Sequence, residues 1–375
     1  MSSSHALYNQ LFAFLRTVHP EPHVTRIRNW VTIMVGMILA QSVQLSQIAH
    51  HIPSDAQAAG RLAQIRRWLS NRFVKPIEFY RPLIRQTLAA WQGRAGFIIL
   101  DGTLVNHGKL QILRLSLAHV CRALPLTWLV IRGTGLVTVE QTQALLDEAL
   151  GLLRGLRRVT LLADRGFRDT DWAEQCRTLG WHYLIRVANN TSVRLTDGRW
   201  LRIERLGVKP AQRRYFHQVA LTKDKAFVCN LMVTWTVATP TQPAELCAVI
   251  TNLRPCRDRL EDYLKRMHIE ASFRDDKSGS CELAHTKLRD PERLNHLLLA
   301  LAVVTLWVHE LGQQVCQRKQ RKEIDPAVQR QLSIFQLGWR KLRRTISLGC
   351  LPPITLVIRP MRLAPVVVVP KHRKC

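Results

Sequence analysis

The chain has 375 residues, 47% of them hydrophobic, so it is long enough for two or three domains with buried cores. It carries 55 Lys and Arg against 27 Asp and Glu, which gives a net charge of +28 and a pI near 10.8. This composition excludes a largely disordered chain. The positive charge makes nucleic acid the leading partner; an anionic membrane surface, or a basic protein that binds no particular polyanion, is the alternative.

The nine cysteines are scattered and include no CxxC pair. This pattern predicts reduced thiols in a cytosolic protein and argues against both a disulfide framework and a zinc site. The longest apolar run, Leu297 to Val308, is well short of the roughly 20 residues needed to span a bilayer. We therefore expect a buried core helix there, no membrane partner and a cytoplasmic location.

Residues 1–92 have periodic apolar positions, which predict a helical domain. Because the chain is strongly basic, we expect this domain to bind DNA. Within it, Leu45–His51 and Ala56–Leu69 are predicted as two amphipathic helices, with Ser54 or Asp55 as the N-cap of the second.

The second of these helices carries four side chains that would contact phosphates or base edges if it were the recognition helix of a helix-turn-helix. They are Arg61, Gln64, Arg66 and Arg67. Simple packing of two helices is an equal alternative.

A change to strand-like sequence comes at Ala95, where the run GFIILDGTLV predicts a first strand. Two strands, a helix, a fourth strand and a second helix are predicted to follow, at Leu110–Cys121, Leu126–Arg132, Thr138–Leu153, Val159–Ala163 and Thr170–Leu179. This order predicts an α/β layer with a mixed sheet, and we assign residues 93–187 to the first part of a catalytic core.

Residues 188–254 are predicted to be a β-rich insertion. Strand-like runs lie in and beside it, at His182–Val187, Ser192–Leu195, Trp200–Glu204, Tyr215–Ala220, Phe227–Val237 and Ala248–Thr251.

Residues 255–315 are expected to complete the core, with Asp290-Pro291-Glu292 as the start of the buried helix. Residues 316–375 are a basic C-terminal region assigned to dimerisation or DNA contact. Its end, from Pro352, is rich in proline and basic residues, and we expect part of it to be disordered.

One helix is predicted from Tyr263 to Lys277. At about 100° per residue, Arg266, Glu270 and Lys277 fall at roughly 300°, 340° and 320° from Tyr263, so one face carries a phenol, two cations and a carboxylate. A solvated face with salt bridges is the alternative interpretation.

Two further carboxylates are predicted at strand ends, Asp101 after the first strand and Asp164 after the fourth. Adjacent strand ends bring such side chains together, and paired carboxylates imply a cation. Glu270 would complete an oxygen-ligand site suited to Mg²⁺ or Mn²⁺, whereas Asp275 and Asp276 project away from its face. For each Asp alone, a turn residue is the commoner role.

Such a site suits phosphoryl chemistry, because two metal ions can activate the attacking oxygen and neutralise the leaving oxygen. Arg266 and Lys277 would hold non-bridging phosphate oxygens, and Tyr263 would donate a hydrogen bond to a phosphate. This combination favours a phosphodiester in DNA or RNA as the substrate.

The spacing of four residues resembles the Y-R-E-K signature of bacterial insertion-sequence transposases grouped with insertion sequence four, relatives of the Tn-five transposase. These residues are Tyr263, Arg266, Glu270 and Lys277, separated by two, three and six residues. The stretches DGT at 101–103 and ADRGF at 163–167 resemble the first and second aspartate boxes of that DDE family. The resemblance covers about residues 30 to 345.

The resemblance implies a ribonuclease H-like core with a β-rich insertion and a helical N-terminal domain. It implies a catalytic and metal site of Asp101, Asp164 and Glu270 with two Mg²⁺ or Mn²⁺ ions. It further implies cut-and-paste transposition by a homodimer on double-stranded DNA, both transposon ends and target, in the bacterial cytoplasm near the nucleoid.

In relatives, a flipped base stacks on a tryptophan of the β insertion. By position, Trp235 is the candidate here and Trp200 is second, although an aromatic residue in a strand more often belongs to the core. A domesticated, non-catalytic DNA-binding protein and a structure-selective nuclease of the same fold, which cuts DNA but never joins it, remain as alternatives.

Overall fold

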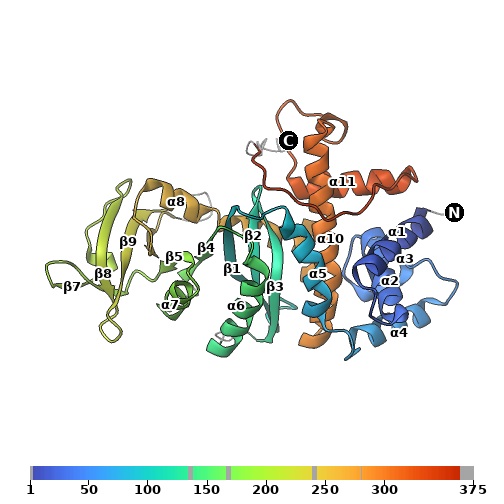
Figure 1. Cartoon of the computed structure of the whole chain (residues 1–375), viewed down its shortest axis with the longest axis horizontal. Coiled ribbons are helices and arrows are strands. Elements are labelled where there is room, and N and C mark those ends of the chain that lie inside the picture. Colours follow the sequence, from blue (N-terminus) through green and yellow to red (C-terminus); the bar gives the residue numbers. More distant parts are fainter. Residues whose placement is uncertain (1–2, 134–137, 166–169, 239–242, 280, 364–375) are drawn as a thin grey trace, which may run out of the picture. The chain divides into compact units, whose positions relative to one another are not determined.

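The computed structural model describes residues 3–133, 138–165, 170–238, 243–279 and 281–363, and Figure 1 shows the path of the chain. These residues form two compact units. Unit 1 contains the described residues of Met1–Gln92, Gly102–Gly155 and His268–Cys375, and unit 2 those of Gly93–Asp101 and Leu156–Met267.

The fold is mixed α/β, with a mixed sheet of ten strands and flanking helices, as the sequence predicts. The strands are β1 (Ala95–Val105), β2 (Leu110–His119), β3 (Arg122–Arg132), β4 (Arg158–Ala163), β5 (His182–Val187), β6 (Ser192–Arg194), β7 (Trp200–Arg202), β8 (Arg214–Leu221), β9 (Phe227–Trp235) and β10 (Leu246–Thr251). Their order is β3-β2-β1-β4-β5-β10-β9-β8-β6-β7.

The helices are α1 (Ser3–Val18), α2 (Val24–Ala40), α3 (Leu45–His51), α4 (Ala58–Leu69), α5 (Pro76–Ala89), α6 (Val139–Leu153), α7 (Thr170–Thr178), α8 (Arg257–Leu264), α9 (Met267–Arg274), α10 (Pro291–Gln317) and α11 (Ile334–Ser347). Most present one apolar stripe to the protein interior; in α1, Leu7, Leu11 and Leu15 recur every fourth residue and are buried.

The predicted start of α4 is wrong by a few residues. The helix begins at Ala58, and its N-cap is Gln57, whose side chain makes no capping hydrogen bond. The Oγ atom of Ser54 instead accepts from the backbone N–H of Ala56 at 3.2 Å. Serine closes a local turn before the helix in this way, which competes with capping.

In unit 2, β4 is the centre of the parallel part of the sheet. Ala95–Leu100 of β1 pair with Arg158–Ala163 of β4, and β4 pairs with β5 in the same direction. From β5 onward the pairing is antiparallel, through β10, β9, β8, β6 and β7. The six strand-like runs predicted between His182 and Thr251 therefore all form strands of this sheet.

Strand β1 extends to Val105, where the run GFIILDGTLV ends, so Asp101 lies within the strand and not at its end as predicted. The parallel register of β1 with β4 stops at the pair Leu100 and Ala163, and β1 continues to Val105 beside its other neighbour, β2. Asp101 is thus the first residue beyond the parallel pairing on β1, as Asp164 is on β4.

Unit 1 is built around α10, which starts where the sequence predicts. Asp290 is its N-cap and accepts from the backbone N–H of Arg293 at 3.0 Å, and Pro291 occupies the first turn. Trp128 of β3 donates its indole N–H to Asn295 Oδ1 at 2.7 Å. By length and composition alone α10 could cross a membrane, but 94% of its most apolar window is buried in the protein, as in a core helix.

In the segment predicted to be partly disordered, the first residues, from Pro352 to Arg359, are packed in unit 1. Leu356 and Ile358 are fully buried. The carboxylate of Glu310 on α10 accepts from the backbone N–H groups of Leu356 at 3.0 Å and Val357 at 3.4 Å. Burial of alternate apolar side chains and these hydrogen bonds hold the segment. Residues 364–375 lie outside the described residues.

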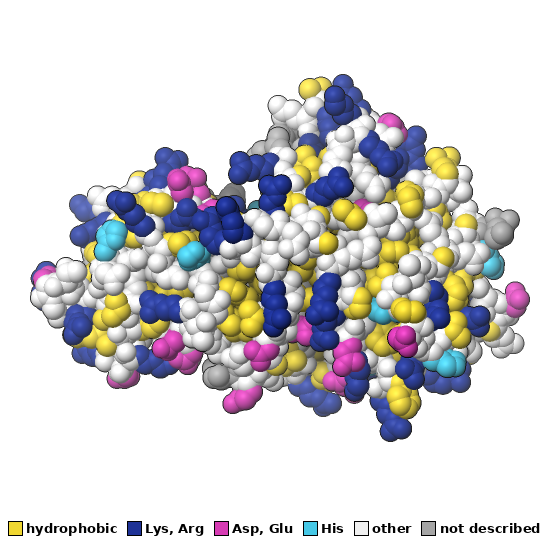
Figure 2. Space-filling model, in the orientation of Figure 1, with side chains coloured by type: hydrophobic (Ala, Val, Ile, Leu, Met, Phe, Trp, Pro, Cys, Tyr) yellow, Lys and Arg dark blue, Asp and Glu magenta, His cyan; other side chains and the backbone are white. Residues whose placement is uncertain are grey.

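Basic side chains are spread over the visible surface of both units. Figure 2 shows Lys and Arg side chains across this face and fewer Asp and Glu side chains among them. The excess positive charge of the sequence is therefore not confined to one tail, and it supports contact with an extended polyanion.

Candidate active site

The parallel pairing of β1 with β4 places Asp101 and Asp164 at the same edge of unit 2, because each follows the last residue in register. Their side chains are partly buried, with exposed fractions of 18% and 29%. The backbone N–H of Arg165 donates to Asp164 Oδ1 at 2.8 Å. The sequence-based expectation that these two carboxylates share an edge therefore agrees with the geometry of unit 2.

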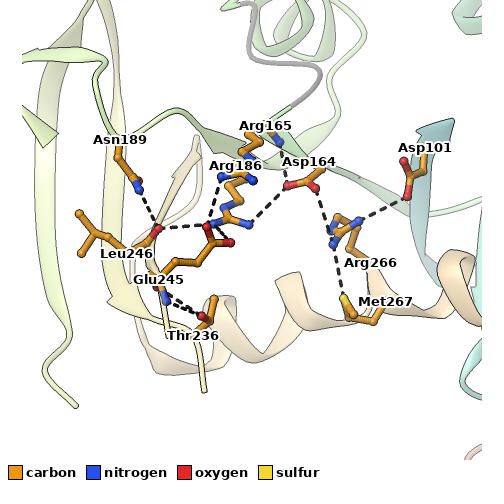
Figure 3. A network of polar contacts seen from close by, with 10 residues as sticks. All are labelled: Asp101, Asp164, Arg165, Arg186, Asn189, Thr236, Glu245, Leu246, Arg266 and Met267. Atoms are coloured by element: carbon orange, nitrogen blue, oxygen red, sulfur yellow. Dashed lines mark hydrogen bonds and ion pairs between the residues drawn. The ribbon is translucent and has the colours of Figure 1, made fainter. Parts of the chain in front are cut away.

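Arg266 lies between these two carboxylates (Figure 3). Its Nη1 atom is 3.3 Å from Asp101 Oδ2, and its Nη2 atom is 3.8 Å from Asp164 Oδ2. Its side chain is only 9% exposed, so the guanidinium is held in place rather than solvated. A cation between two neighbouring carboxylates offsets their mutual repulsion.

Two residues that the sequence did not single out extend this network, Arg186 and Glu245 (Figure 3). The buried Arg186 places Nη2 2.6 Å from Glu245 Oε1 and Nη1 3.8 Å from Asp164 Oδ1. Because Ala163 pairs with Ile185, Arg186 stands beside Asp164 on the neighbouring parallel strand. A single arginine in the apolar strand HYLIRV was the signal that would have identified it.

Tyr263, on α8, adds a buried hydroxyl to unit 2. It is 6% exposed, and its hydroxyl has no hydrogen-bond partner in the described part of the chain. Burial raises the pKa of the Tyr263 phenol well above its usual value, and the negative charge of Asp164 adds to the effect. The phenol therefore stays protonated and is available as a hydrogen-bond donor.

The predicted single helix from Tyr263 to Lys277 is wrong. Helix α8 ends at Leu264, a turn covers residues 265 and 266, and α9 begins at Met267. The backbone N–H of Lys265 donates to the carbonyl of Asp262 at 3.1 Å, and that of Arg266 donates to the carbonyl of Tyr263 at 3.0 Å. The ammonium of Lys265 lies 3.8 Å from the ring centroid of Phe97. The helical-wheel angles across this break therefore do not apply.

The remaining two residues of the predicted signature, Glu270 and Lys277, belong to unit 1. Glu270 lies in the first turn of α9, and Lys277 lies in a π-helix that continues from it, Asp275–Gly279. A π-helix turns less per residue than an α-helix, so Lys277 also departs from the predicted angle. Partial burial lowers the pKa of the Lys277 ammonium.

Asp275 and Asp276, which the sequence placed off the active face, are buried in ion pairs with the β2–β3 hairpin. Asp276 Oδ2 lies 2.7 Å from Arg114 Nη1, with exposed fractions of 4% and 9% for the two side chains. Asp275 pairs with Arg122. The hydroxyl of Ser272 accepts from the backbone N–H of Ala123 at 2.8 Å. These contacts fix α9, the helix of Glu270, to the hairpin within unit 1.

The predicted DNA-contacting side chains of α4 differ in their surroundings. Arg61 Nη1 donates to the carbonyl of Ser54 at 2.9 Å, and Gln64 Nε2 donates to Asn29 Oδ1 at 2.8 Å. Arg66 and Arg67 are exposed.

The two candidate tryptophans also have partners within the protein. The half-buried Trp235 donates its indole N–H to the carbonyl of Val208 at 2.8 Å, and the guanidinium of Arg194 lies 5.8 Å from the ring of Trp200. In the second aspartate box, Gly166 and Phe167 lie outside the described residues.

The side chains of Asp101 and Asp164 are suited to a hard divalent cation, because their donor atoms are carboxylate oxygens. Among the described residues, no three His, Cys, Asp or Glu side chains are gathered into a metal-binding group. Unit 2 alone thus supplies two carboxylates, and Glu270 of unit 1 was predicted as the third ligand.

The chain was compared with models of protein families and with curated proteins. The family model described as transposase DDE domain matches residues 93–307, more than half of the chain. The matched stretch contains Asp101, Asp164 and Arg266 as well as Glu270. No curated protein matches the chain.

Proposed function

The chain belongs to the transposase DDE domain family, and from this premise we propose that it moves a DNA element by a cut-and-paste reaction. Family membership supports DNA transposase activity in general, a DNA substrate and a metal-dependent DNA-cleaving enzyme. The mixed sheet with flanking helices is consistent with the ribonuclease H-like core of such an enzyme. In the proposed reaction, water cleaves at the element end and the freed 3′-hydroxyl then joins target DNA.

The observation that carries the proposal is the pair of carboxylates, Asp101 and Asp164, with the buried Arg266 between them. Two carboxylates at one sheet edge are stable only beside positive charge. A catalytic centre for phosphodiesters needs such a combination, because divalent ions and arginine both neutralise charge on phosphate oxygens.

We propose Asp101, Asp164 and Glu270 as the carboxylates that hold two divalent ions, Mg²⁺ or Mn²⁺, of the kind that DDE transposases generally use. When bound, such ions activate the attacking oxygen and neutralise the leaving oxygen. Arg266 and Lys277 would bind non-bridging phosphate oxygens. Arg186 would orient the Asp164 carboxylate.

The spacing of Tyr263, Arg266, Glu270 and Lys277 supports a finer assignment to the insertion-sequence-four group. On that basis we propose a homodimer that brings two transposon ends together. We keep Trp235 as the candidate for stacking on a flipped base, which would require its indole to leave the carbonyl of Val208.

The test is cleavage of a linear DNA that carries the sequences flanking the gene, with the full chain and Mg²⁺. A cut at the element end that exposes a 3′-hydroxyl, followed by joining to a supercoiled target, supports the proposal. Binding without any cut would favour the non-catalytic DNA-binding protein, and cutting without joining would favour the structure-selective nuclease.

Replacing Tyr263 with Phe tests the proposed hydrogen bond to phosphate. The hydroxyl has no partner among the described residues, so we expect the melting temperature to be unchanged or slightly raised. Cleavage is expected to fall roughly tenfold, because a hydrogen bond to a charged group contributes about 1.5 kcal/mol.

The matched control for this variant is Tyr183→Phe, in the same unit, whose hydroxyl accepts from Arg177 Nη2 at 3.3 Å. This change should lower the melting temperature and leave cleavage by the folded fraction unchanged. Wild-type cleavage rates in Tyr263→Phe would contradict a role for the phenol in the reaction.

Replacing Glu245 with Gln tests how Arg186 acts on Asp164. Without the Glu245 charge, 2.6 Å from Arg186 Nη2, the guanidinium is expected to pair more closely with Asp164 and to oppose binding of a cation there. We expect Mn²⁺ to bind roughly three- to tenfold more weakly, about 0.7 to 1.4 kcal/mol, as measured by titration calorimetry or by the electron paramagnetic resonance of free Mn²⁺.

Glu204→Gln provides the comparison, since Glu204 also pairs with an arginine in unit 2 but with both side chains well exposed. This control should bind Mn²⁺ as the wild type does. Equal Mn²⁺ affinity in Glu245→Gln and the wild type would rule out the proposed competition.

A further inference from the structure

Unit 1 contains a groove of about 610 Å³ to which no function has been assigned so far. One side is formed by the start of α3 and by α4, and the other by residues 286–290 and the first turn of α10. We call it the basic groove, because four cations line it: Arg66, Lys287, Arg289 and Arg293. The single carboxylate in its lining, Asp290, is already occupied as the N-cap of α10.

The two sides of the basic groove are fixed by hydrogen bonds. Before α3, the backbone N–H of Val43 donates to the carbonyl of Cys281 at 2.7 Å. On the other side, Asn106 Nδ2 donates to the carbonyl of Leu288 at 2.9 Å, and Arg293 Nε donates to Ser70 Oγ at 2.9 Å. The groove is therefore preformed, which reduces the conformational entropy that the protein loses when a ligand binds.

The segment from Thr286 to Asp290 displays its cations at a regular interval. Its backbone is extended at both ends, with φ −59° and ψ 135° at Thr286 and φ −95° and ψ 123° at Asp290. Lys287 and Arg289 are exposed, whereas the side chain of Thr286 is buried. In an extended chain, residues two apart are separated by about 6.6 Å and share one side.

This interval is of the same order as the through-space separation of neighbouring phosphates on one DNA strand, so two flexible cations can meet two successive phosphates. In the part of the chain that the structure describes, no ion pair joins Lys287 or Arg289 to a carboxylate. The partly exposed apolar side chain of Leu62, on α4, also lines the groove and suits the carbon atoms of the sugars.

We propose that the basic groove binds the sugar–phosphate backbone of double-stranded DNA, with Lys287 and Arg289 each neutralising one phosphate. The proposal rests on the proposed function, because it assumes that the chain acts on DNA. The groove shares no residue with the carboxylate site. Of the four side chains predicted to contact DNA from α4, only the exposed Arg66 lines the groove.

The experiment compares the wild-type chain with Lys287→Gln/Arg289→Gln. Binding of a fluorescein-labelled duplex of arbitrary sequence is measured by fluorescence anisotropy at several salt concentrations. Because each phosphate contact contributes about 0.9 to the slope of log K against log salt, the double variant should lose about 1.8 from that slope. The charge-preserving variant Lys287→Arg/Arg289→Lys should keep the wild-type slope.

The matched control is Arg157→Gln/Arg158→Gln, which removes two exposed charges at the start of β4, the end opposite Asp164. It should keep the wild-type slope. An unchanged slope in the groove variant would overturn this inference alone, whereas a wild-type chain that binds duplex without salt dependence would contradict the proposed function as well. If the groove variant loses binding of a polyglutamate peptide but keeps duplex binding, the groove belongs to an acidic protein partner.

Discussion

Replacing Glu270 with Gln is expected to abolish DNA cleavage while binding of the element ends stays at the wild-type level. The amide has nearly the same size, but it lacks the negative charge with which we propose that Glu270 holds a divalent ion. Loss of this charge should slow cleavage roughly 10³-fold or more, about 4 kcal/mol of transition-state stabilisation. The same outcome is expected for Asp101→Asn and Asp164→Asn.

Two measurements check this result, cleavage of labelled element-end DNA in Mg²⁺ and a gel-shift titration on the same DNA. The control is Glu261→Gln on α8. The Glu261 carboxylate is 58% exposed, and among the described residues it forms an ion pair only with the nearby Arg257. The control should cleave normally. Full cleavage by Glu270→Gln in Mg²⁺ would remove Glu270 from the proposed site.

The largest effect on stability is expected for Asp276→Asn. Asp276 and Arg114 form an ion pair whose side chains are 4% and 9% exposed, and breaking such a buried pair from one side leaves an uncompensated charge. We expect the free energy of unfolding to fall by about 3 to 5 kcal/mol, measured by urea denaturation. Cleavage should fall too, because Asp276 anchors the segment that continues from the helix of Glu270.

Two further variants separate charge from packing at this position. Arg114→Met/Asp276→Leu removes both charges and fills similar volume, so it should recover most of the lost stability. Asp197→Asn, which breaks the exposed pair with Arg199, should cause no measurable change. If Asp276→Asn unfolds at the wild-type urea concentration, the buried pair does not hold this part of unit 1.

The strands and helices around the aspartates could be predicted because their signals are local. Apolar β-prone runs bounded by turn residues predicted β1 to β5, and Asp290-Pro291 predicted the start of α10. The position of Asp101 inside β1 could not be predicted, because the strand continues beside β2 after its parallel pairing with β4 has ended.

The helical face around Glu270 shows where a periodic pattern fails. Its angles assume one regular helix, but the chain turns at Lys265 and Arg266 and widens into a π-helix at Asp275. Arg266 nevertheless reaches Asp101, because the turn directs it to the sheet edge in unit 2. The conspicuous acidic pair, Asp275 and Asp276, is buried against arginines of β2 and β3, a contact that depends on long-range packing and not on the local pattern.

By itself, the sequence determined the positive charge that favours DNA as a partner and the order of strands and helices in the core. It also singled out Asp101 and Asp164, because each directly follows an apolar run. These features depend on composition and on neighbouring residues. Only the tertiary structure decided that Arg186 and Glu245 join Asp164, and that Lys287 and Arg289 line a groove with α4. These residues are dozens to hundreds of positions from their partners, and only packing of distant segments brings such side chains together.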